Sequence, residues 1–333
     1  MATYNGERFL QDQLESIAGQ TLLPYELVIT DDGSSDGTLD IIKEFSKGAP
    51  FPVLLHRNKM RLGYADNFLK AASLCRGDLI AFSDQDDVWL DHKCARCIKA
   101  FKTESVILTV HSGRVVDEDL KPAGWLFPKI GRDVVTLPLR KGPGFGLSGY
   151  AMMFRSSMPL LFTSPRPWGA QDWVAPMIHD QWIIFLAQVF GQIAYIQEPL
   201  ALYRRHDDTA TNPSRPSLTR SVHGSMSAAA ADYASLAQLN GHWADYLEKA
   251  LPSLSDEQRL MAKKGADYYR GIEQMLLSRS NIYQSGKKVP MRILSLLRLL
   301  AQGGYGQQQR GGLGLRALVK DASVGVLGIN HLG

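Results

Sequence analysis

The chain has 333 residues, of which 45% are hydrophobic and 21% are charged, and its formal net charge is +4. This is an ordinary globular composition with length enough for one large core or two domains, and so mild a charge argues against dedicated nucleic-acid binding. There is no uncharged apolar run long enough to predict a transmembrane helix and no start typical of a secretory signal. Three cysteines cannot make a disulfide framework, which fits a reducing cytoplasm.

Strand and helix patterns alternate along the first 110 residues. Apolar runs typical of strands occupy residues 1–4, 26–30, 52–56, 79–83 and 106–110. Helical spacing of apolar residues lies between them, at residues 10–17, 39–45, 64–74 and 91–101, and Asn5 is placed to cap the first helix. Such alternation predicts an α/β fold with a doubly wound, mostly parallel sheet.

The later part of the chain changes character twice. Residues 117–143 are irregular, and after them the pattern predicts a strand at 150–154, a proline-rich loop at 164–176, a helix at 179–190 and short strands at 193–196 and 200–203. From about residue 217 the pattern is helical, with helices expected at 228–251, 256–278 and 289–300 and a mobile Gly/Gln-rich tail at 303–312. We therefore expect one α/β domain over residues 1–215 and a helical region over 216–333.

Three carboxylates follow the apolar run 79–82 directly, in Ser83-Asp84-Gln85-Asp86-Asp87-Val88-Trp89. Ligands of open α/β sheets bind at the carboxyl ends of strands. In an extended segment Asp84 and Asp86 point to one side and Asp87 to the other. Two carboxylates on one side suit Mg²⁺ or Mn²⁺, which prefer oxygen ligands and share them with phosphates. The alternative reading is an acidic turn exposed to solvent.

The pair Cys94 and Cys97 has the spacing of a redox or zinc motif. It lies in a helix-like stretch, and no second pair accompanies it. We therefore interpret both residues as reduced cysteines that pack in the interior.

A series of short motifs follows in order along the first 210 residues. They are Ala2-Thr3-Tyr4-Asn5-Gly6-Glu7, Asp31-Asp32-Gly33-Ser34-Ser35-Asp36-Gly37-Thr38, Gly63-Tyr64-Ala65-Asp66-Asn67-Phe68, the acidic segment already described, His179-Asp180-Gln181-Trp182 and Tyr203-Arg204-Arg205-His206. In this order they resemble glycosyltransferase family 2, and within it the bacterial rhamnosyltransferase-like branch that builds surface polysaccharides. The resemblance implies a GT-A fold and an inverting transfer from a nucleotide-diphosphate sugar to a hydroxyl of a glycan or lipid-linked saccharide.

The resemblance also implies roles for individual residues. Residues that would bind the nucleotide-sugar are Thr3, Tyr4, Asp31, Asp32, Gly63, Asn67, Asp84 and Arg204. In this set Asp31 or Asp32 would accept a hydrogen bond from the pyrimidine; loop capping is the alternative role of that pair, and both roles can hold together. Asp86, with Asp84 and His206, would hold a divalent metal, Mn²⁺ or Mg²⁺, that neutralises the leaving diphosphate.

Asp180 is the candidate general base, since inverting displacement needs one carboxylate to take the acceptor proton. It stands near a predicted helix start, and the helix N-terminus is expected to lower its pKa. A helix cap is its alternative role, and Asp172 is the rival base. Residues 144–149, rich in glycine, would let the backbone approach the acceptor sugar. Of Trp89, Trp168, Trp173 and Trp182, some would face sugar rings, and at least two are expected in the core.

Two segments carry further expectations. The family has several apolar residues before Thr3-Tyr4-Asn5-Gly6, so the first strand is expected to be cut short at Met1, and an added upstream pentapeptide is expected to stabilise the fold. Residues 287–300 form a basic amphipathic helix, read either as a packed helix or as a peripheral contact with the inner face of the cell membrane.

Two other functions remain open from the sequence. One is a sugar-phosphate nucleotidyltransferase, although the N-terminal phosphate loop of such enzymes is missing. The other is a nucleotide-sugar-binding protein without turnover. The subfamily resemblance suggests deoxythymidine-diphosphate rhamnose as the donor and leaves uridine-diphosphate sugars open.

Overall fold

The computed structural model describes residues 1–140, 148–169, 175–207, 230–284, 288–306 and 313–326. Its first sheet is wholly parallel, in the order β1-β2-β3. These strands are β1 (Ala2–Thr3), β2 (Leu27–Asp31) and β3 (Val53–Arg57). β2 is buried along its whole length, as its apolar sequence requires. The helices that connect and follow them are α1 (Leu10–Ala18), α2 (Thr38–Gly48) and α3 (Tyr64–Leu74).

The second sheet is mixed, in the order β4-β9-β6-β10-β5, with β7 paired to β6 and β8 paired to β10. β10 runs parallel to β6 along much of its length, and the other pairs are antiparallel. The strands are β4 (Leu79–Ala81), β5 (Val88–Trp89), β6 (Val106–Val116), β7 (Pro122–Leu126), β8 (Val134–Thr136), β9 (Met152–Arg155) and β10 (Gln192–Arg204). The two strands expected at 193–196 and 200–203 are thus one long strand with register shifts.

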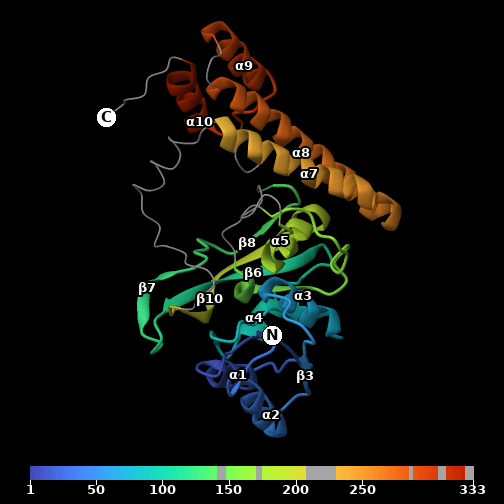
Figure 1. The fold of residues 1–333 in the computed structure, drawn as a ribbon, viewed down its shortest axis with the longest axis vertical. Helices are drawn as coiled ribbons and strands as arrows, with labels where there is room; N and C mark the ends of the chain where they lie inside the picture. Colours follow the sequence, from blue (N-terminus) through green and yellow to red (C-terminus); the bar gives the residue numbers. More distant parts are fainter. Residues whose placement is uncertain (141–147, 170–174, 208–229, 285–287, 307–312, 327–333) are drawn as a thin grey trace.

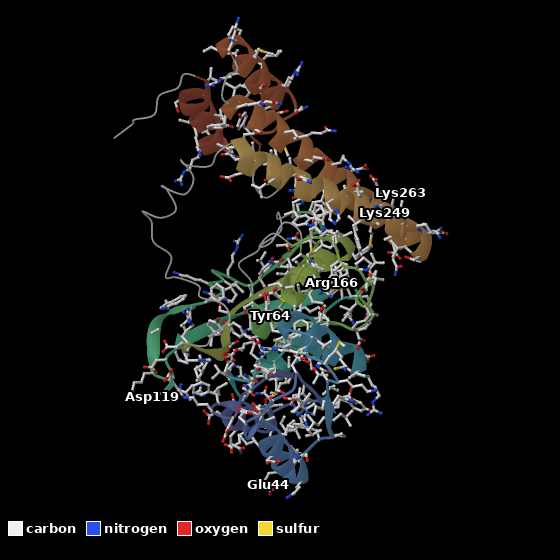
Figure 2. All side chains as sticks on the ribbon, in the orientation of Figure 1. Glu44, Tyr64, Asp119, Arg166, Lys249 and Lys263 are labelled. Carbon is white, nitrogen blue, oxygen red and sulfur yellow. The ribbon has the colours of Figure 1, made fainter. Side chains whose placement is uncertain are left out.

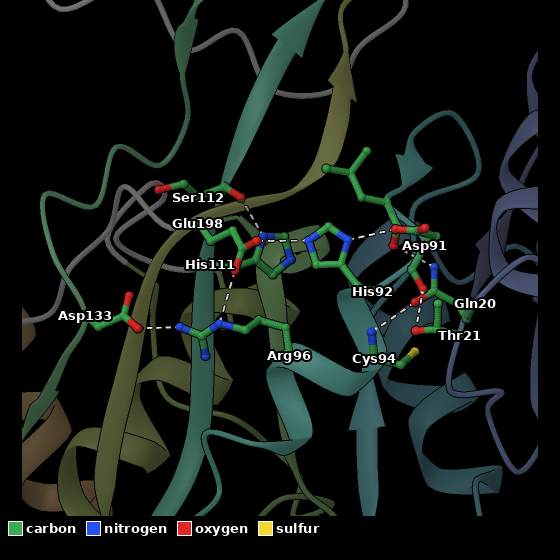
Figure 3. Close-up of polar contacts among 11 residues, drawn as sticks. Gln20, Thr21, Asp91, His92, Cys94, Arg96, His111, Ser112, Asp133 and Glu198 are labelled. Carbon is green, nitrogen blue, oxygen red and sulfur yellow. Dashed lines mark hydrogen bonds and ion pairs between the residues drawn. The ribbon is translucent and has the colours of Figure 1, made fainter.

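The helix α4 (Lys93–Ile98) follows the acidic segment and is held by polar contacts on its flanks. Arg96 pairs with Glu198 on β10 and with Asp133 just before β8, and His92 also contacts Glu198 (Figure 3). On the other flank, Gln20 accepts a hydrogen bond from the backbone of Cys94 at 2.9 Å. These contacts fix the chain that leaves the acidic segment.

The apolar core joins both sheets and runs into the C-terminal helices. Its centre is α5 (His179–Phe190), which is buried nearly all round, as a helix without a polar face must be. Trp89 and Trp182 belong to this core, so the expectation of at least two buried tryptophans is confirmed. Cys94 and Cys97 are buried free thiols, as the packing interpretation predicted.

A long antiparallel hairpin lies across α5 at the top of the molecule (Figure 1). Its arms are α7 (Ala230–Ala250) and α8 (Asp256–Tyr283), joined by a 3-10 turn at Leu251–Ser253. Ser255 and Gln258 form a capping box at the start of α8. Beyond them come α9 (Val289–Ala301), α10 (Leu315–Lys320) and a single π-helical turn, Asp321–Val326.

The end of the helical region is fastened to α8 by one buried carboxylate. Asp321 accepts hydrogen bonds from Arg279 at 3.0 Å and from the hydroxyls of Tyr283 and Tyr305, each at 2.8 Å. Three donors on one fully buried carboxylate compensate its loss of water. In the described part of the chain, no helix has the length and apolar character needed to cross a bilayer.

The strand β1 consists of Ala2 and Thr3. The amine of Met1 is buried and donates to the carbonyl of Val28 at 2.8 Å, and burial lowers its pKa to about 6. Beside it, a cavity of about 360 Å³ is lined by residues of β2, β4 and the segment that precedes β2.

Candidate functional site

A cavity of about 670 Å³ opens where β1, β2 and β4 end. Eight of the residues that the sequence singled out line it: Thr3, Tyr4, Asp32, Gly63, Asn67, Asp84, Asp86 and His206. The remaining predicted residues, Asp31, Arg204 and Asp180, lie outside its lining. This volume falls in the range that small-molecule and cofactor sites occupy.

Asp31 is buried beneath the cavity, where it holds the loop after β2. Its carboxylate accepts hydrogen bonds from the backbone N–H groups of Gly33 and Ser34 at 3.1 and 2.9 Å, and from the hydroxyl of Thr3 at 3.0 Å. Of the two carboxylates expected to face a pyrimidine, only Asp32 lines the cavity. By these contacts Asp31 caps the loop after β2.

Asp32 anchors the segment that enters α3. It accepts hydrogen bonds from the backbone N–H groups of Leu62 and Gly63 at 2.7 and 2.8 Å. Gly63 has φ +80°, a conformation that glycine adopts without strain, so the chain turns here and begins the helix. Asn67, one turn into α3, donates to the carbonyls of Thr3 and Thr30 and so ties α3 to β1 and β2.

Tyr4 and Arg61 form the aromatic edge of the cavity. The guanidinium of Arg61 lies 3.9 Å from the centroid of the Tyr4 ring. The Tyr4 backbone is fixed by Gln85, which accepts from its N–H at 2.9 Å and donates to its carbonyl at 3.1 Å. Gly6 makes this approach possible, because a Cβ there would lie 2.5 Å from the Gln85 amide oxygen. Gln85 and Arg61 were missed by the sequence analysis, since neither type signals such a role.

Asn5, expected to cap α1, has another function. Its carboxamide oxygen accepts from the backbone N–H of Ser35 at 2.9 Å, and its φ is +47°. The helix begins only at Leu10, so Asn5 is too early to cap it. The capping prediction was wrong because residues 5–9 form a turn that joins the loop after β2.

The acidic segment concentrates negative charge at the floor of the cavity. Burial, together with the charges of Asp86 and Asp180, raises the pKa of Asp84 to about 7. Burial, together with the charges of Asp86 and Asp84, raises the pKa of Asp87 well above its ordinary value. Such mutual repulsion is what a cation bound between the carboxylates would relieve.

Arg204 lies beneath this segment, with its side chain almost wholly buried. It donates to the backbone carbonyls of Asp86 at 2.8 Å and Glu118 at 2.7 Å, and to the carboxylate of Asp12 at 2.6 Å. Its own N–H donates to Asp87 at 3.0 Å. Arg204 thus supports the backbone of the acidic segment from the side away from the cavity.

His206 approaches the acidic segment from the end of β10. Its Nε2 lies 2.8 Å from a carboxylate oxygen of Asp86. In the part of the chain that the structure describes, no three His, Cys, Asp or Glu side chains converge as a ready-made metal site. Asp86 and His206 nevertheless fit one divalent cation, because Mg²⁺ and Mn²⁺ take many of their ligands from substrate phosphates and water. The repulsion of Asp84 by Asp86 and Asp180 also favours a cation at this place.

Asp180 lines a smaller cavity of about 110 Å³ together with Asp84 and Asp86. The two cavities share both of these aspartates, so Asp180 faces the acidic segment from across the site. The prediction of a lowered pKa is wrong in direction. The hydrogen bond from the Gln181 backbone favours the charged form, but burial outweighs it and raises the pKa of Asp180 to about 6.

His179 is a buried neighbour that fixes the start of α5. Its ring stacks on Phe68, with centroids 4.3 Å apart, and burial lowers its pKa to about 3. Gly149 lies against it, where a Cβ would stand 2.7 Å from Nε2. Residues 144–147 of the glycine-rich segment, Trp173 and the rival base Asp172 lie outside the described residues.

Lys93 is a buried cation that the sequence analysis did not identify. Its ammonium donates to the carbonyl of Tyr150 at 2.7 Å and lies 3.9 Å from the centroid of the Trp89 ring. Burial lowers its pKa to about 8, against the attraction of Asp87 and Asp84. The available signal was a lysine beside Cys94 and Cys97 in a short helix, which is too weak to reveal a charge in the core.

Comparison with known proteins places these features in a family. Residues 1–160 match the family described as Glycosyl transferase family 2. The chain is 29% identical to an uncharacterized glycosyltransferase of Nostoc sp. over 217 residues, which are 62% of this chain and 63% of that protein. It is 39% identical over 102 residues to dTDP-rhamnosyl transferase RfbG of Shigella flexneri, covering 29% and 35% of the two chains.

The chain therefore spans less than two thirds of the length of these relatives. A crystal structure of residues 1–349 of S. aureus TarS in complex with UDP-GlcNAc superposes with a TM-score of 0.54 at 15% identity, over 92% of this chain and 91% of that one. This likeness bears on the fold, which is GT-A as the motifs led us to expect. Residues 1–160 are thus similar to glycosyltransferase family 2, the family that the motifs resemble.

Proposed function

We propose that the chain is an inverting glycosyltransferase that moves a sugar from a nucleotide-diphosphate donor to a hydroxyl of a glycan or lipid-linked saccharide. The observation that carries this proposal is the junction of two cavities at Asp84 and Asp86. The larger cavity has the volume for a nucleotide-sugar, and the smaller one contains Asp180. The match of residues 1–160 to glycosyltransferase family 2 supports the same reaction class.

In this proposal the nucleotide occupies the part of the larger cavity between Tyr4 and Asp32. The Tyr4 ring and the Arg61 guanidinium offer flat faces to a pyrimidine, and Asp32 offers an acceptor to its ring N–H. The diphosphate then lies toward Asp86 and His206, which brings the anomeric carbon toward Asp180.

Asp180 acts as the general base. Its carboxylate takes the proton of the acceptor hydroxyl while the hydroxyl oxygen forms a bond to the anomeric carbon. The bond between that carbon and the diphosphate oxygen breaks, and the nucleoside diphosphate leaves with the electron pair. Attack opposite to the leaving group inverts the anomeric centre. A pKa of about 6 leaves Asp180 mostly ionised at neutral pH and still basic enough to accept the proton.

Asp86 and His206, with Asp84, are the residues that would hold a divalent cation. Bound there, Mn²⁺ or Mg²⁺ would neutralise the charge that develops on the leaving diphosphate. The contact of 2.8 Å between Asp86 and His206 is the support for this assignment.

The proposed donor is deoxythymidine-diphosphate rhamnose, and the proposed setting is cell-surface polysaccharide synthesis. Support comes from the partial likeness to a dTDP-rhamnosyl transferase. The test is to incubate the protein with Mn²⁺, a mixture of rhamnose, mannose, glucose and N-acetylglucosamine as acceptors, and dTDP-rhamnose, UDP-glucose or UDP-GlcNAc as donor. Nucleoside diphosphate release is measured by phosphorus NMR. We expect release with dTDP-rhamnose and none in Asp180→Asn.

The same experiment separates the alternative functions. A sugar-phosphate nucleotidyltransferase would instead consume a sugar phosphate and nucleoside triphosphate and release pyrophosphate. A binding protein without turnover would bind a donor and release nothing, even with a saccharide acceptor present. Either result would contradict the transferase proposal.

We also propose that α9 and α10 contact an anionic membrane surface. Exposed apolar side chains on the two helices are Val289, Met291, Ile293, Leu294, Leu297, Leu300, Leu315 and Val319. Neither helix contains an acidic residue, whereas Arg298 and Arg316 are exposed cations on them. An apolar face bordered by cations is the pattern of helices that lie in a membrane interface.

The test for this contact is co-sedimentation with vesicles of phosphatidylglycerol and phosphatidylethanolamine. Leu294→Ser with Leu297→Ser should reduce the bound fraction several-fold without unfolding the protein, since both side chains are already exposed. Leu260→Ser, an exposed leucine on α8, is the matched control. Equal binding by all three proteins would exclude α9 as the contact.

A further inference from the structure

A cavity of about 460 Å³ lies between the sheet domain and the helical hairpin, and it shares no described lining residue with the nucleotide cavity. One wall is the segment around Pro165, Pro167 and Trp168, together with Pro176. The other wall is a face of α7, which contributes His242, Asp245, Tyr246 and Lys249. The cavity has the size of a ligand site and no role in the function proposed above.

The walls of this cavity are joined to one another by hydrogen bonds. The indole of Trp243 on α7 donates to the carbonyl of Trp168 at 2.8 Å, and the hydroxyls of Thr163 and Tyr246 lie 2.8 Å apart. Within the first wall, the backbone N–H of Met177 donates to the carbonyl of Pro167 at 2.8 Å. Because these hydrogen bonds fix the two walls relative to each other, the cavity is preformed for a ligand.

The lining combines flat aromatic rings with groups that bind hydroxyls. Trp168 stacks on His242 with ring centroids 4.1 Å apart and planes 11° apart, and Tyr246 adds a third ring. Lys249 is exposed, and its ammonium makes no hydrogen bond or ion pair within the described part of the chain. Asp245 adds a carboxylate that already accepts from Arg270 at 2.5 Å.

This combination suits a saccharide better than other ligand classes. Sugar rings present C–H faces that pack on aromatic rings, and their edges carry hydroxyls that need both donors and acceptors. A lipid chain would offer the Lys249 ammonium no acceptor. A nucleic acid would need a concentrated basic surface, which the carboxylate of Asp245 interrupts.

The cavity and the proposed catalytic centre lie on one short segment of chain. Pro176 lines the cavity, whereas Ile178 and Asp180 line the small cavity with Asp84. Two residues of chain span at most about 7 Å, so Pro176 and Ile178 are close neighbours in space.

Arg166 braces this segment. It donates to the carbonyl of Met177 at 2.8 Å and to Asp66 on α3 at 2.6 Å. Figure 2 shows Arg166 between Tyr64, at the start of α3, and Lys249 on α7. Arg166 thus connects the wall of this cavity to α3 and to the segment that leads into α5.

We infer that this cavity binds sugar residues of the acceptor glycan at a distance from the hydroxyl that reacts. The inference rests on the proposed function, because it assigns the acceptor of that reaction to a second site. Trp168 and His242 provide the stacking face, and Lys249 donates to sugar hydroxyls. A long acceptor then gains contacts that a monosaccharide lacks.

The test uses hexasaccharides and monosaccharides of rhamnose, mannose, glucose and N-acetylglucosamine as probes, with binding measured by saturation-transfer NMR. At least one hexasaccharide should bind the wild-type protein more tightly than its monosaccharide. Its Kd should rise about tenfold in Lys249→Ala and in His242→Ala. Lys249→Ala replaces an exposed side chain and leaves the fold intact, which a melting curve checks. Lys263→Ala, an exposed lysine on α8 labelled in Figure 2, is the matched control and should bind as the wild type does.

Binding of dTDP and UDP is measured on the same samples, so the two proposals fail separately. If no hexasaccharide binds the wild type, or if the two variants bind as the control does, the saccharide site is refuted whatever the nucleotides do. If nucleotide binding is absent while the hexasaccharide result holds, the proposed transferase function fails and the cavity remains a saccharide site.

Discussion

The imidazole of His206 lies 2.8 Å from the carboxylate of Asp86, across 120 residues of sequence. The end of β10 brings the histidine to the acidic segment, and Arg204, two residues earlier, holds the backbone of Asp86 from below. The proposed cation ligand, His206, and the residue that supports Asp86, Arg204, therefore both come from the end of β10. Changes in either residue are therefore expected to act on the same site in different ways.

Substitution of His206 should weaken the metal without removing the nucleotide cavity. In His206→Ala the Mn²⁺ concentration for half-maximal donor turnover should rise about 10- to 100-fold, because one neutral ligand is lost. His206→Asn keeps a polar group and should recover part of this loss. His56→Asn is the control, since that histidine lies on β3 and lines neither cavity of the proposed site. An unchanged Mn²⁺ requirement in His206→Ala would remove His206 from the metal site.

Substitution of Asp180 should abolish transfer and leave donor binding intact. Asp180→Asn should lower kcat at least about 100-fold, the usual contribution of a general base. In the wild type, kcat/KM should fall as the pH drops through about 6, because the base must be deprotonated. Retained turnover in Asp180→Asn would exclude Asp180 as the base.

Asp180→Asn should also be more stable toward unfolding than the wild type. The folded pKa of about 6 exceeds the ordinary value of 3.8, so the ionised carboxylate destabilises the fold above pH 6. As the pH falls from 6 to 4 this cost disappears. Asp180→Asn should therefore gain about 3 kcal/mol at pH 7.5 and almost nothing near pH 4. Chemical denaturation at the two pH values measures the difference.

Substitution of Arg204 should damage the site through the backbone. Arg204→Met leaves Asp12 and the carbonyls of Asp86 and Glu118 without their donor, which should cost about 3 kcal/mol. Arg204→Lys should recover little, since one ammonium cannot reach three acceptors in different directions. Urea unfolding measures the loss. If Arg204→Lys has the same free energy of unfolding as the wild type, the geometry of the guanidinium is unimportant.

An extension before Met1 should stabilise the fold. The cavity of about 360 Å³ beside Met1 is lined by apolar residues of β2 and β4, and the Met1 amine is buried there at a cost. Five apolar residues would fill the space and pair with both strands, raising Tm by about 3 °C or more. A Gly/Ser extension of equal length removes the same buried charge and is the control. An apolar extension that does no better than this control would refute the strand pairing.

The order of the elements could be predicted because hydrophobic periodicity sets local structure. Helices α3 and α5 begin and end where the sequence indicated, since each is bounded by loop residues and has an apolar face or interior. The short strands β5, β7 and β8 were missed, because two to five residues carry little periodicity and form only through their partners.

The site could be predicted as a set of residues but not as a set of contacts. The carboxylates follow strand ends, which is a local signal, and most of them line one cavity. The raised pKa of Asp180 depends on burial by distant segments, so the helix N-terminus alone gave the wrong direction. The support of Tyr4 by Gln85, 81 residues away, and the buried charge of Lys93 likewise arise only when the chain is folded.

Calorimetric titration of dTDP-rhamnose and UDP-sugars, with and without Mn²⁺, tests the central claim most directly. The comparison is between the wild type and Asp86→Ala. We predict that one donor binds the wild type with Mn²⁺, and that Asp86→Ala or omission of Mn²⁺ weakens binding at least about tenfold. The absence of donor binding by the wild type, or equal binding by Asp86→Ala, would contradict the proposed nucleotide-sugar site.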